Sequence, residues 1–505
     1  MTNNKQIKKV VIAGGGTAGW MTAAALSQHF QDKGIEITLI ESSQIGTIGV
    51  GEATIPTLRR FYHKLGFTDL DVLKSTAATC KLGIEFKDWY KKGTSFIHPF
   101  GIYGQGTREV DFHHYWLRHK SNNGTTPLAE FSLGVKLADA TKFTLPSSQP
   151  ESQLEIFDWA LHFDAALFAK LMREYATNHN VTLIDKKIDN VLLDQQTGEI
   201  TSLSFTDGTV EHGDLFIDCS GFRALLIEGA LKTGFEDWSQ WLLCDRAVAV
   251  QTKTVNEPLS RTVSQAHEFG WQWRIPLQNR QGNGYVYSSQ YCSDESAKDC
   301  LLANVEGELL HQPRMFKFTP GRRSKSWNKN CIAVGLSAGF LEPLESTSIA
   351  LVETAIDKII QSFEGNSYNQ ETINRFNDIT VMEYERVRDF IILHYKANQR
   401  EDSAFWQRCR AMSLPDTLST KLEHYQKTGD IKHYPFELFG KDSWLAILDG
   451  FAMYPDKYNK KADNMPLEYL NKNLLFMRER VKQSVDKAPK HYDFIKQHCQ
   501  FMSDT

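Results

Sequence analysis

Hydrophobic and polar positions near the start of the chain predict a strand, a helix and a second strand in close succession. Residues 9–13 form an apolar run, residues 17–30 show a helical pattern, and residues 35–40 form another apolar run that ends at Glu41. Short apolar runs are typical of buried strands, and strands that alternate with helices are typical of a parallel sheet. We therefore expect an α/β fold with a Rossmann-like body that begins here.

Two later apolar runs predict further buried strands. Residues 214–218 precede the small residues 219–221, and residues 331–334 precede the small-residue stretch 335–339. A helical pattern starts again at Ile349. A strand, a turn of small residues and a helix start together make a site for anions and cofactors, because the first amides of a helix have no partner within it.

The remaining patterns are mixed. Residues 81–89 alternate between apolar and polar positions, which predicts a half-buried strand, and residues 162–177 predict an amphipathic helix. Residues 121–155 are rich in Ser, Thr and Pro and indicate an inserted loop region. Long charged and amphipathic patterns over residues 366–400 and 465–500 predict helices.

These elements predict three regions along the chain. A discontinuous nucleotide-binding body is expected from residues 1–60, 160–235 and 320–362. An inserted β-rich region on the substrate side is expected from residues 61–159 and 236–319, and a helical C-terminal cap from residues 363–505.

Composition narrows the function classes. The 505 residues carry a net charge of −4, which argues against a surface that binds nucleic acid. The eight cysteines form no C-x-x-C pair, so we expect no zinc ribbon or thioredoxin-type site and no metal. The sequence shows no signal-peptide core and no apolar run of about 18 residues. These features predict a cytoplasmic protein that does not enter the membrane.

The stretch Gly14-Gly15-Gly16-Thr17-Ala18-Gly19 fits the dinucleotide-binding pattern G-x-G-x-x-G. The pattern alone is weak, but here it follows a predicted strand and opens a predicted helix, with Glu41 about 20 residues beyond it. Gly14 would allow the tight turn, Gly16 would let a pyrophosphate approach, and Glu41 would accept from a ribose hydroxyl. The alternative is a glycine-rich turn without a ligand.

FAD is favoured over NAD because two later segments, residues 215–221 and 331–349, resemble the flavin-contacting segments of FAD monooxygenases. The Gly-Asp pair of the hydroxylases is replaced by Leu336-Ser337. This departure weighs against an ordinary hydroxylase.

Several longer motifs, in order, resemble the flavin-dependent tryptophan halogenases over nearly the whole chain. They are Gly14 to Trp20, Gly49 to Pro56, the W-x-W-x-I-P sequence Trp271 to Pro276, Gly339 to Thr347, and Asp389 to Trp406. In that family the W-x-W-x-I-P motif is thought to keep the substrate away from the flavin.

The resemblance implies a flavin monooxygenase-like fold and a specific chemistry. A separate flavin reductase would supply FAD as FADH2, and oxygen with chloride or bromide would give hypohalous acid. The acid would pass through the protein to a second pocket, where a lysine directs the halogen onto a small aromatic substrate of the indole or tryptophan kind. The protein is expected to be a monomer or a homodimer.

The resemblance also implies site residues. Lys81 and Glu345 match the catalytic positions, Thr347 and Ser348 the halide positions, and His98, Phe100 and Trp444 the substrate positions. The implied cofactor-binding residues are Gly14, Gly15, Gly16, Ala18, Gly19, Glu41, Ser42, Ile45, Val50, Ala53, Leu336 and Ile349.

The residues alone also allow structural explanations. Lys81 could be a solvated lysine on the polar face of a strand with Glu85 and Lys87. Glu345, Thr347 and Ser348 could serve the helix start through its dipole and cap.

The region around Trp444 lacks a convincing tyrosine pair and glutamate for an amino-acid group. Indole, a substituted indole and a peptide-borne tryptophan therefore stay open as substrates beside free tryptophan.

Three rival functions remain. Gly335-Leu336-Ser337-Ala338-Gly339 spells the G-x-S-x-G elbow of serine hydrolases, with Ser337 as nucleophile. An FAD-dependent aromatic hydroxylase or reductase would have the same body and would oxidise NAD(P)H by itself. A catalytically silent FAD-fold protein would bind the flavin without turnover.

Overall fold

A computed structural model describes residues 4–45, 51–363 and 365–501. The chain forms two compact units, each built from three segments. The first comprises Met1–Ala77, Phe163–Asp245 and Lys317–Glu385, and the second comprises Ala78–His162, Arg246–Phe316 and Arg386–Thr505. Residues 363–505, expected as a separate cap, are divided between the two units.

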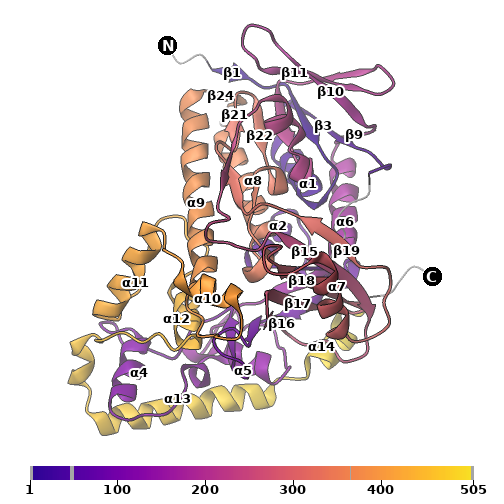
Figure 1. Ribbon diagram of the computed structural model, residues 1–505. Coiled ribbons are helices and arrows are strands. Elements are labelled where there is room, and N and C mark those ends of the chain that lie inside the picture. The colour runs from indigo at the N-terminus through magenta and orange to yellow at the C-terminus, as the bar shows by residue number, and fades with distance from the viewer. Residues whose placement is uncertain (1–3, 46–50, 364, 502–505) are drawn as a thin grey trace. The chain divides into compact units, whose positions relative to one another are not determined.

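The first unit is organised by a six-stranded sheet in the order β21-β22-β13-β2-β3-β9 (Figure 1). Neighbouring strands from β22 to β9 are parallel, and β21 is an antiparallel edge. The strands are β2 (Lys9–Ala13), β3 (Glu36–Glu41), β9 (Thr182–Asp185), β13 (Leu215–Asp218), β21 (Trp327–Asn328) and β22 (Cys331–Ala333). The α/β fold predicted from strand and helix alternation is thus confirmed.

The helices of this unit include α1 (Thr17–Phe30), which packs against α6 (Ala165–Asn178) and α8 (Ser348–Ser362). The sequence placed the start of α6 at residue 162, which is wrong. Asp164 accepts hydrogen bonds from the backbone N–H of Ala166 and Leu167, so the helix begins at Ala165. Residues 160–164 form strand β8 instead.

Shorter elements complete the first unit. The helices are α2 (Thr57–Lys64) and α3 (Asp69–Ser75). The strands are β1 (Lys5–Gln6), β4 (Gly51–Ala53), β10 (Ile188–Leu193), β11 (Ile200–Phe205), β12 (Val210–His212), β14 (Phe235–Asp237), β20 (Gly321–Arg323), β23 (Gly339–Phe340) and β24 (Ser367–Tyr368).

The second unit is organised by a seven-stranded sheet in the order β19-β15-β18-β17-β16-β6-β7. Its strands are β6 (Gly83–Lys87), β7 (Ser95–Pro99), β15 (Arg246–Lys253), β16 (Thr262–His267), β17 (Gly270–Pro276), β18 (Arg280–Tyr287) and β19 (Arg314–Lys317). Only β16 and β6 are parallel neighbours among its described pairs. A cluster of buried rings that includes Trp89, Trp271 and Trp406 packs beside it.

The single strand expected over residues 81–89 is two strands. β5 (Thr79–Lys81) ends at Lys81, and β6 begins at Gly83. Leu82 lies between them because its N–H donates to the carbonyl of Ser260 and its carbonyl accepts from Phe100. Lys81 therefore does not share a strand with Glu85, and it is fully buried rather than solvated.

Helices dominate the rest of the second unit. They are α4 (Phe112–Ser121), α5 (Leu133–Asp139), α7 (Asp294–Ala303), α10 (Ala404–Ala411), α11 (Asp416–Thr428), α12 (Lys441–Gly450), α13 (Leu467–Lys487) and α14 (His491–His498), together with the end of α9 (Gln370–Lys396). The long C-terminal helices confirm the prediction. Residues 121–155 were expected as loop, yet they contain α5, whose Leu133 and Leu137 are buried.

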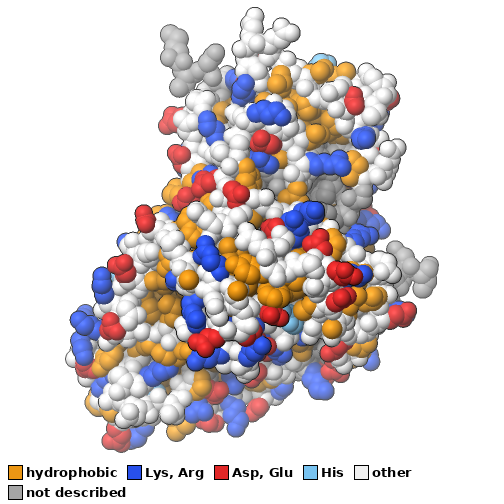
Figure 2. Space-filling view, viewed as in Figure 1, with side chains coloured by type: hydrophobic (Ala, Val, Ile, Leu, Met, Phe, Trp, Pro, Cys, Tyr) orange, Lys and Arg blue, Asp and Glu red, His pale blue; other side chains and the backbone are white. Residues whose placement is uncertain are grey.

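The helices and the surface charge show what kind of surface the protein presents. No helix in the described ranges is long and apolar enough to cross a membrane. On the face in Figure 2, charged side chains of both signs are interspersed, and neither sign gathers into one large area.

All eight cysteines lie in the described ranges, and none forms a disulfide. Only Cys300 is partly exposed. Burial raises the pKa of the Cys219 and Cys331 thiols well above their usual value, and the nearby Asp218 carboxylate adds to the effect.

A buried carboxyl group on α8 makes stability depend on pH. Glu353 is only 7% exposed, and burial raises its pKa to about 8. The folded protein therefore holds this proton more tightly than the unfolded chain. The protonated Glu353 side chain contributes to the free energy of unfolding at low pH, and this contribution is lost between about pH 4.5 and 8. We expect Glu353→Gln to raise the free energy of unfolding by on the order of a few kcal/mol at pH 8.5 and to change it little at pH 5.

Thermal unfolding at the two pH values checks this prediction. Glu479→Gln on an exposed position of α13 is the matched control. Equal effects of Glu353→Gln at both pH values would contradict the assignment.

Candidate functional site

The glycine-rich turn between β2 and α1 is built around close backbone contacts. Gly14 has φ of +117°, and a Cβ there would lie 2.3 Å from the carbonyl oxygen of Cys219. A Cβ at Gly19 would lie 1.9 Å from the carbonyl oxygen of Gly14. The structure thus requires glycine at both positions, because the backbone carbonyl groups of Cys219 and Gly14 cannot move aside for a side chain.

Gly15 makes room for the Glu41 carboxylate, since a Cβ at Gly15 would lie 1.8 Å from Glu41 Oε2. The Trp20 indole N–H donates to Oε2 at 3.2 Å, and Arg173 donates to Oε1 at 2.9 Å. The glycine motif pointed to Glu41 but not to its partners Trp20 and Arg173. No local pattern could have found Arg173, which lies on α6, 132 residues from Glu41 in sequence.

Gly16 differs from its neighbours because a Cβ there would meet no atom within 4 Å. It is the N-cap of α1, and the first turn of α1 carries no acidic residue. A 14-residue helix therefore begins at open space, and its unpaired amides and dipole favour an anion such as a phosphate.

The other predicted cofactor residues lie in several elements. Ala18 is on α1, and a Cβ at Gly335 would lie 2.9 Å from its methyl group, so the small-residue turn after β22 meets this helix. Leu336 is half-buried in that turn, Ala53 is buried at the end of β4, and Ile45 is 45% exposed. Ser42 directly follows β3. Val50 lies outside the described residues.

Ser337 has a structural hydrogen-bonding role. It is fully buried, and its hydroxyl donates to the carbonyl oxygens of Asp218 and of Val334. It therefore links the ends of two neighbouring strands, β13 and β22. With its proton directed to carbonyl oxygens and no imidazole hydrogen-bonded to it in the described chain, Ser337 lacks the activation that a hydrolase nucleophile needs.

The start of α8 gathers the predicted halide residues. The short 3₁₀ helix η6 (Pro343–Glu345) ends at Ser346, which has φ of +59°, and Thr347 then caps α8. Thr347 is fully buried, and its hydroxyl has no hydrogen-bond partner among the described residues.

The first turn of α8 contains no acidic residue. Glu345, Ser348 and Ile349 complete this segment, and Glu345 is 1% exposed. A buried, unpartnered hydroxyl at a helix N-terminus is suited to a small anion.

In the second unit, Lys81 and Phe100 lie together. Lys81 ends β5, and its Nζ atom lies 5.1 Å from the centre of the Phe100 ring. The Phe100 N–H donates to the carbonyl of Leu82 at 2.9 Å, which holds the two segments side by side. A buried ammonium next to an aromatic face forms a polarising site with an apolar wall.

His98 and Trp444 belong to a different ring cluster of the same unit. The Phe390 ring lies 5.7 Å from His98 and 4.9 Å from Trp444, and it stacks on Phe439 at 4.0 Å. The ring contacts that define this cluster are those of Phe390 with His98, Phe439 and Trp444. The Trp444 indole N–H has no hydrogen-bond partner in the described chain, and Lys421 Nζ lies 4.2 Å from that ring. No sequence motif had pointed to Phe390 or Phe439 as members of this cluster.

The W-x-W-x-I-P motif forms strand β17. Trp271 and Trp273 are buried, with ring centres 6.0 Å apart. A Cβ at Gly284 on the neighbouring strand would lie 2.0 Å from the Trp273 ring, so this indole covers the strand β18 closely. The last residue, Pro276, accepts a hydrogen bond from Thr79, two residues before Lys81.

A histidine cluster and a surface pocket of the second unit share no residues with the predicted halogenation site. His113, His114 and Asp430 each have one metal-ligating atom within 4.8 Å of the others, as the ligands of a candidate cation site would. His113 bonds the Gly429 carbonyl at 2.9 Å, and His114 bonds Asp430 at 2.8 Å and the Asn459 N–H at 3.2 Å. These bonds already account for how both rings lie.

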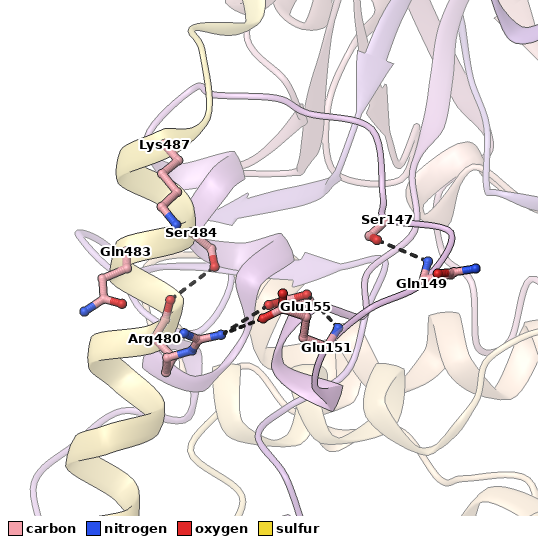
Figure 3. A pocket seen from close by; sticks show the side chains of 8 residues that line it. All are labelled: Ser147, Gln149, Glu151, Glu155, Arg480, Gln483, Ser484 and Lys487. Carbon is pink, nitrogen blue, oxygen red and sulfur yellow. Dashed lines mark hydrogen bonds and ion pairs between the residues drawn. The ribbon is translucent and has the colours of Figure 1, made fainter.

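A pocket of about 240 Å³ lies along α13 (Figure 3). Its lining is polar, and Arg480 pairs there with Glu155 at 3.5 Å and Glu151 at 3.6 Å. It contains none of the predicted site residues.

Comparison with known proteins identifies the family. The sequence profile described as tryptophan halogenase matches residues 9–467. The 7-chloro-L-tryptophan 6-halogenase KtzR of Kutzneria sp. (strain 744) is 33% identical over 520 residues, which cover 96% of this chain and 98% of that protein.

Two solved structures are more similar to this chain in sequence than KtzR is. BrvH, a flavin-dependent halogenase from Brevundimonas sp. BAL3, matches with a TM-score of 0.94 and 50% identity, covering 97% of this chain and 99% of its own. Xcc4156, a flavin-dependent halogenase from Xanthomonas campestris, matches with a TM-score of 0.95 and 40% identity, covering 99% and 100%.

The α/β fold with a helical C-terminal region is that of flavin-dependent halogenase structures, as the sequence predicted. Membership implies FAD as the cofactor and an aromatic substrate. The chain belongs to the flavin-dependent tryptophan halogenase family, and it is a flavin-dependent halogenase.

Proposed function

We propose that this halogenase uses FADH2, oxygen and chloride or bromide to make hypohalous acid, and that Lys81 directs the halogen onto an indole-like substrate. The observation that carries the proposal is the fully buried Lys81 ammonium beside the Phe100 ring. A lysine without solvent is costly to keep in a protein, which supports a functional reason for it.

The cofactor residues fit FAD. The open space before Gly16 suits the pyrophosphate, and the Glu41 carboxylate, oriented by Trp20 and Arg173, suits a ribose hydroxyl. Bound reduced flavin would supply the electrons with which oxygen becomes able to oxidise halide. The flavin itself would come from a separate reductase.

The start of α8 is the proposed halide site. The unpartnered Thr347 hydroxyl and the first amides of α8, with Ser348, would hold the anion. Ile349 and Leu336 would contact the flavin.

Lys81 would act on hypohalous acid by donating a hydrogen bond to its oxygen. The carbon–halogen bond forms while the oxygen–halogen bond breaks, and the oxygen leaves as water after it takes up a proton. The proton of the aromatic carbon is lost at the end, and Glu345 is the proposed acceptor that also stabilises the cationic ring. His98, Phe100 and Trp444 are the proposed substrate-contacting rings.

An indole without an amino-acid group is the favoured substrate. The two solved structures at 50% and 40% identity are described only as flavin-dependent halogenases, whereas the tryptophan 6-halogenase SttH of Streptomyces toxytricini is 32% identical. The segment after Trp444 reads Asp449-Gly450-Phe451-Ala452, and the tyrosines that follow it, Tyr454 and Tyr458, are not adjacent to each other.

Turnover with FADH2, bromide and either indole or tryptophan tests the function, with the product mass as readout. We expect brominated indole to form faster than brominated tryptophan. A clear preference for tryptophan would contradict the substrate proposal. NAD(P)H oxidation by the isolated protein, with a hydroxylated product, would favour the aromatic hydroxylase instead.

The halide site gives a separate prediction. Thr347→Val keeps the shape of the side chain and removes its hydroxyl. We expect the KM for bromide to rise about 10-fold, which corresponds to the loss of one hydrogen bond to a charged group. Thr354→Val, on the same helix with its hydroxyl bonded to the Leu351 carbonyl, is the control and should leave this KM unchanged. An unchanged KM in Thr347→Val would remove Thr347 from the site.

A further inference from the structure

The strand that carries Lys81 is too short to fix its own position. β5 has three residues and pairs with β8 (Ala160–Asp164), with Thr79 opposite His162 and Lys81 opposite Ala160. Thr79, Lys81 and His162 therefore lie on the same face of this pair, because alternate residues of a strand share a face. So short a strand has few ladder bonds and depends on side-chain contacts for its place.

His162 supplies such contacts through both ring nitrogens. Thr79 Oγ1 donates its single proton to the Pro276 carbonyl at 2.7 Å, so it accepts from His162 Nδ1–H at 2.9 Å. His162 Nε2 then carries no proton and accepts from the Thr262 hydroxyl at 2.9 Å. One tautomer satisfies the whole chain of hydrogen bonds.

This chain of hydrogen bonds connects four strands. Thr79 begins β5, His162 lies on β8, Thr262 begins β16, and Pro276 ends the W-x-W-x-I-P strand β17. The imidazole is fully buried. Two motifs that are about 190 residues apart in sequence, one with Lys81 and one with Trp271, are therefore tied to each other through it.

A second histidine holds the backbone of β5. The Cys80 N–H donates to His491 Nε2 at 3.1 Å, and His491 Nδ1 bonds the Pro258 carbonyl at 2.9 Å. Burial lowers the pKa of His491 to about 4. Burial and then the charges of Lys81 and His491 lower the pKa of His162 well below its usual value. Both rings are thus neutral near neutral pH, and neither repels the Lys81 ammonium.

We propose that His162 is a positioning residue for halogenation, which fixes β5 through Thr79 and so sets where the Lys81 ammonium lies. The inference rests on the role proposed for Lys81. Without the imidazole, the buried Thr79 and Thr262 hydroxyls lose a partner and β5 can shift. Hypohalous acid would still be made, but it would leave the protein without reacting with the substrate.

The experiment compares two yields in one reaction with limiting FADH2, bromide and indole. They are brominated indole and the free hypobromous acid that a 1,3-diketone captures. In His162→Leu we expect the ratio of product to captured acid to fall by about 10- to 100-fold, the scale that a displacement near 1 Å causes. His162→Asn, whose amide can donate to Thr79, should restore part of the ratio.

The matched control is His113→Leu. His113 is also buried and in the second unit, and its ring bonds the backbone carbonyl of Gly429. Burial lowers its pKa to about 4, so it is also neutral. This variant should lose stability and keep the ratio. If His162→Leu does not fold, Thr262→Val removes only the donor to Nε2 and should lower the ratio to a smaller degree.

Three results would overturn the inference. The first is that the yields of brominated indole and of captured hypobromous acid fall equally in the His162 variants. The second is that His113→Leu changes the ratio of the two yields as much as His162→Leu does. The third is that the ratio is unchanged in folded His162→Leu or Thr262→Val. Lys81→Ala separates the two proposals. If that variant still makes product, the lysine role fails; if it makes none while the His162 variants keep their ratio, only the His162 inference fails.

Discussion

Lys81→Ala protein is expected to bind FAD as the wild type does and to make no measurable halogenated indole. The physical reason is that the ammonium is the only group proposed to polarise hypohalous acid next to the substrate. Losing such a group typically lowers a rate by at least about 10²- to 10³-fold. The residues proposed to hold FAD, Gly14 to Gly19 and Glu41, are unchanged in this variant, so FAD should still bind.

Mass analysis of the indole product and titration of FAD by fluorescence check the two halves of this prediction. Lys81→Met, which keeps the length of the side chain without its charge, should behave like alanine. Lys87→Ala, with its side chain 38% exposed on the next strand, is the control and should keep full activity. Halogenated indole at wild-type yield from Lys81→Ala would refute the assignment.

Gly16→Ala is expected to keep its fold and its unfolding temperature but to bind FAD weakly. A methyl group at Gly16 meets no protein atom within 4 Å, so it costs the folded protein little. It would instead occupy the space in which we place the pyrophosphate. Overlap of this kind costs about 1–3 kcal/mol, which is roughly a 10- to 100-fold higher Kd.

The chain offers a closely matched control. Gly440 is the N-cap of α12, its φ of −76° and ψ of 179° match the −77° and −177° of Gly16, and its Cβ would also meet no atom within 4 Å. Gly440→Ala should therefore change neither stability nor FAD affinity. If Gly16→Ala binds FAD as tightly as Gly440→Ala does, the pyrophosphate does not pass this turn.

Local sequence was sufficient for the nucleotide-binding end of the fold. The predicted strand 9–13 and helix 17–30 have the observed bounds, because apolar periodicity and glycine positions specify both elements within 30 residues. The end of β5 could not be predicted in the same way. It depends on Ser260 and Phe100, which reach Leu82 only in the folded chain.

In the candidate site, too, local sequence identified some residues but not the remote partners that surround them. Motifs pointed to Lys81 and Thr347, but nothing local distinguishes a buried lysine from a solvated one, and alternation even favoured the solvated position. The partners that give these residues their environment are remote in sequence. His162 is 83 residues from Thr79, and Arg173 is 132 residues from Glu41.

The state of the cysteines has a consequence for the lifetime of the enzyme. Hypohalous acids oxidise thiolates far more readily than protonated thiols, because the thiolate is the nucleophile. Cys219 lies directly beside the glycine-rich turn, yet burial and Asp218 keep its sulfur protonated. The Cys219 thiol is thus held in the form that reacts slowly with hypohalous acid. Burial also raises the pKa of the Cys300 thiol, but Cys300 is the one partly exposed cysteine, so oxidative self-inactivation should begin there.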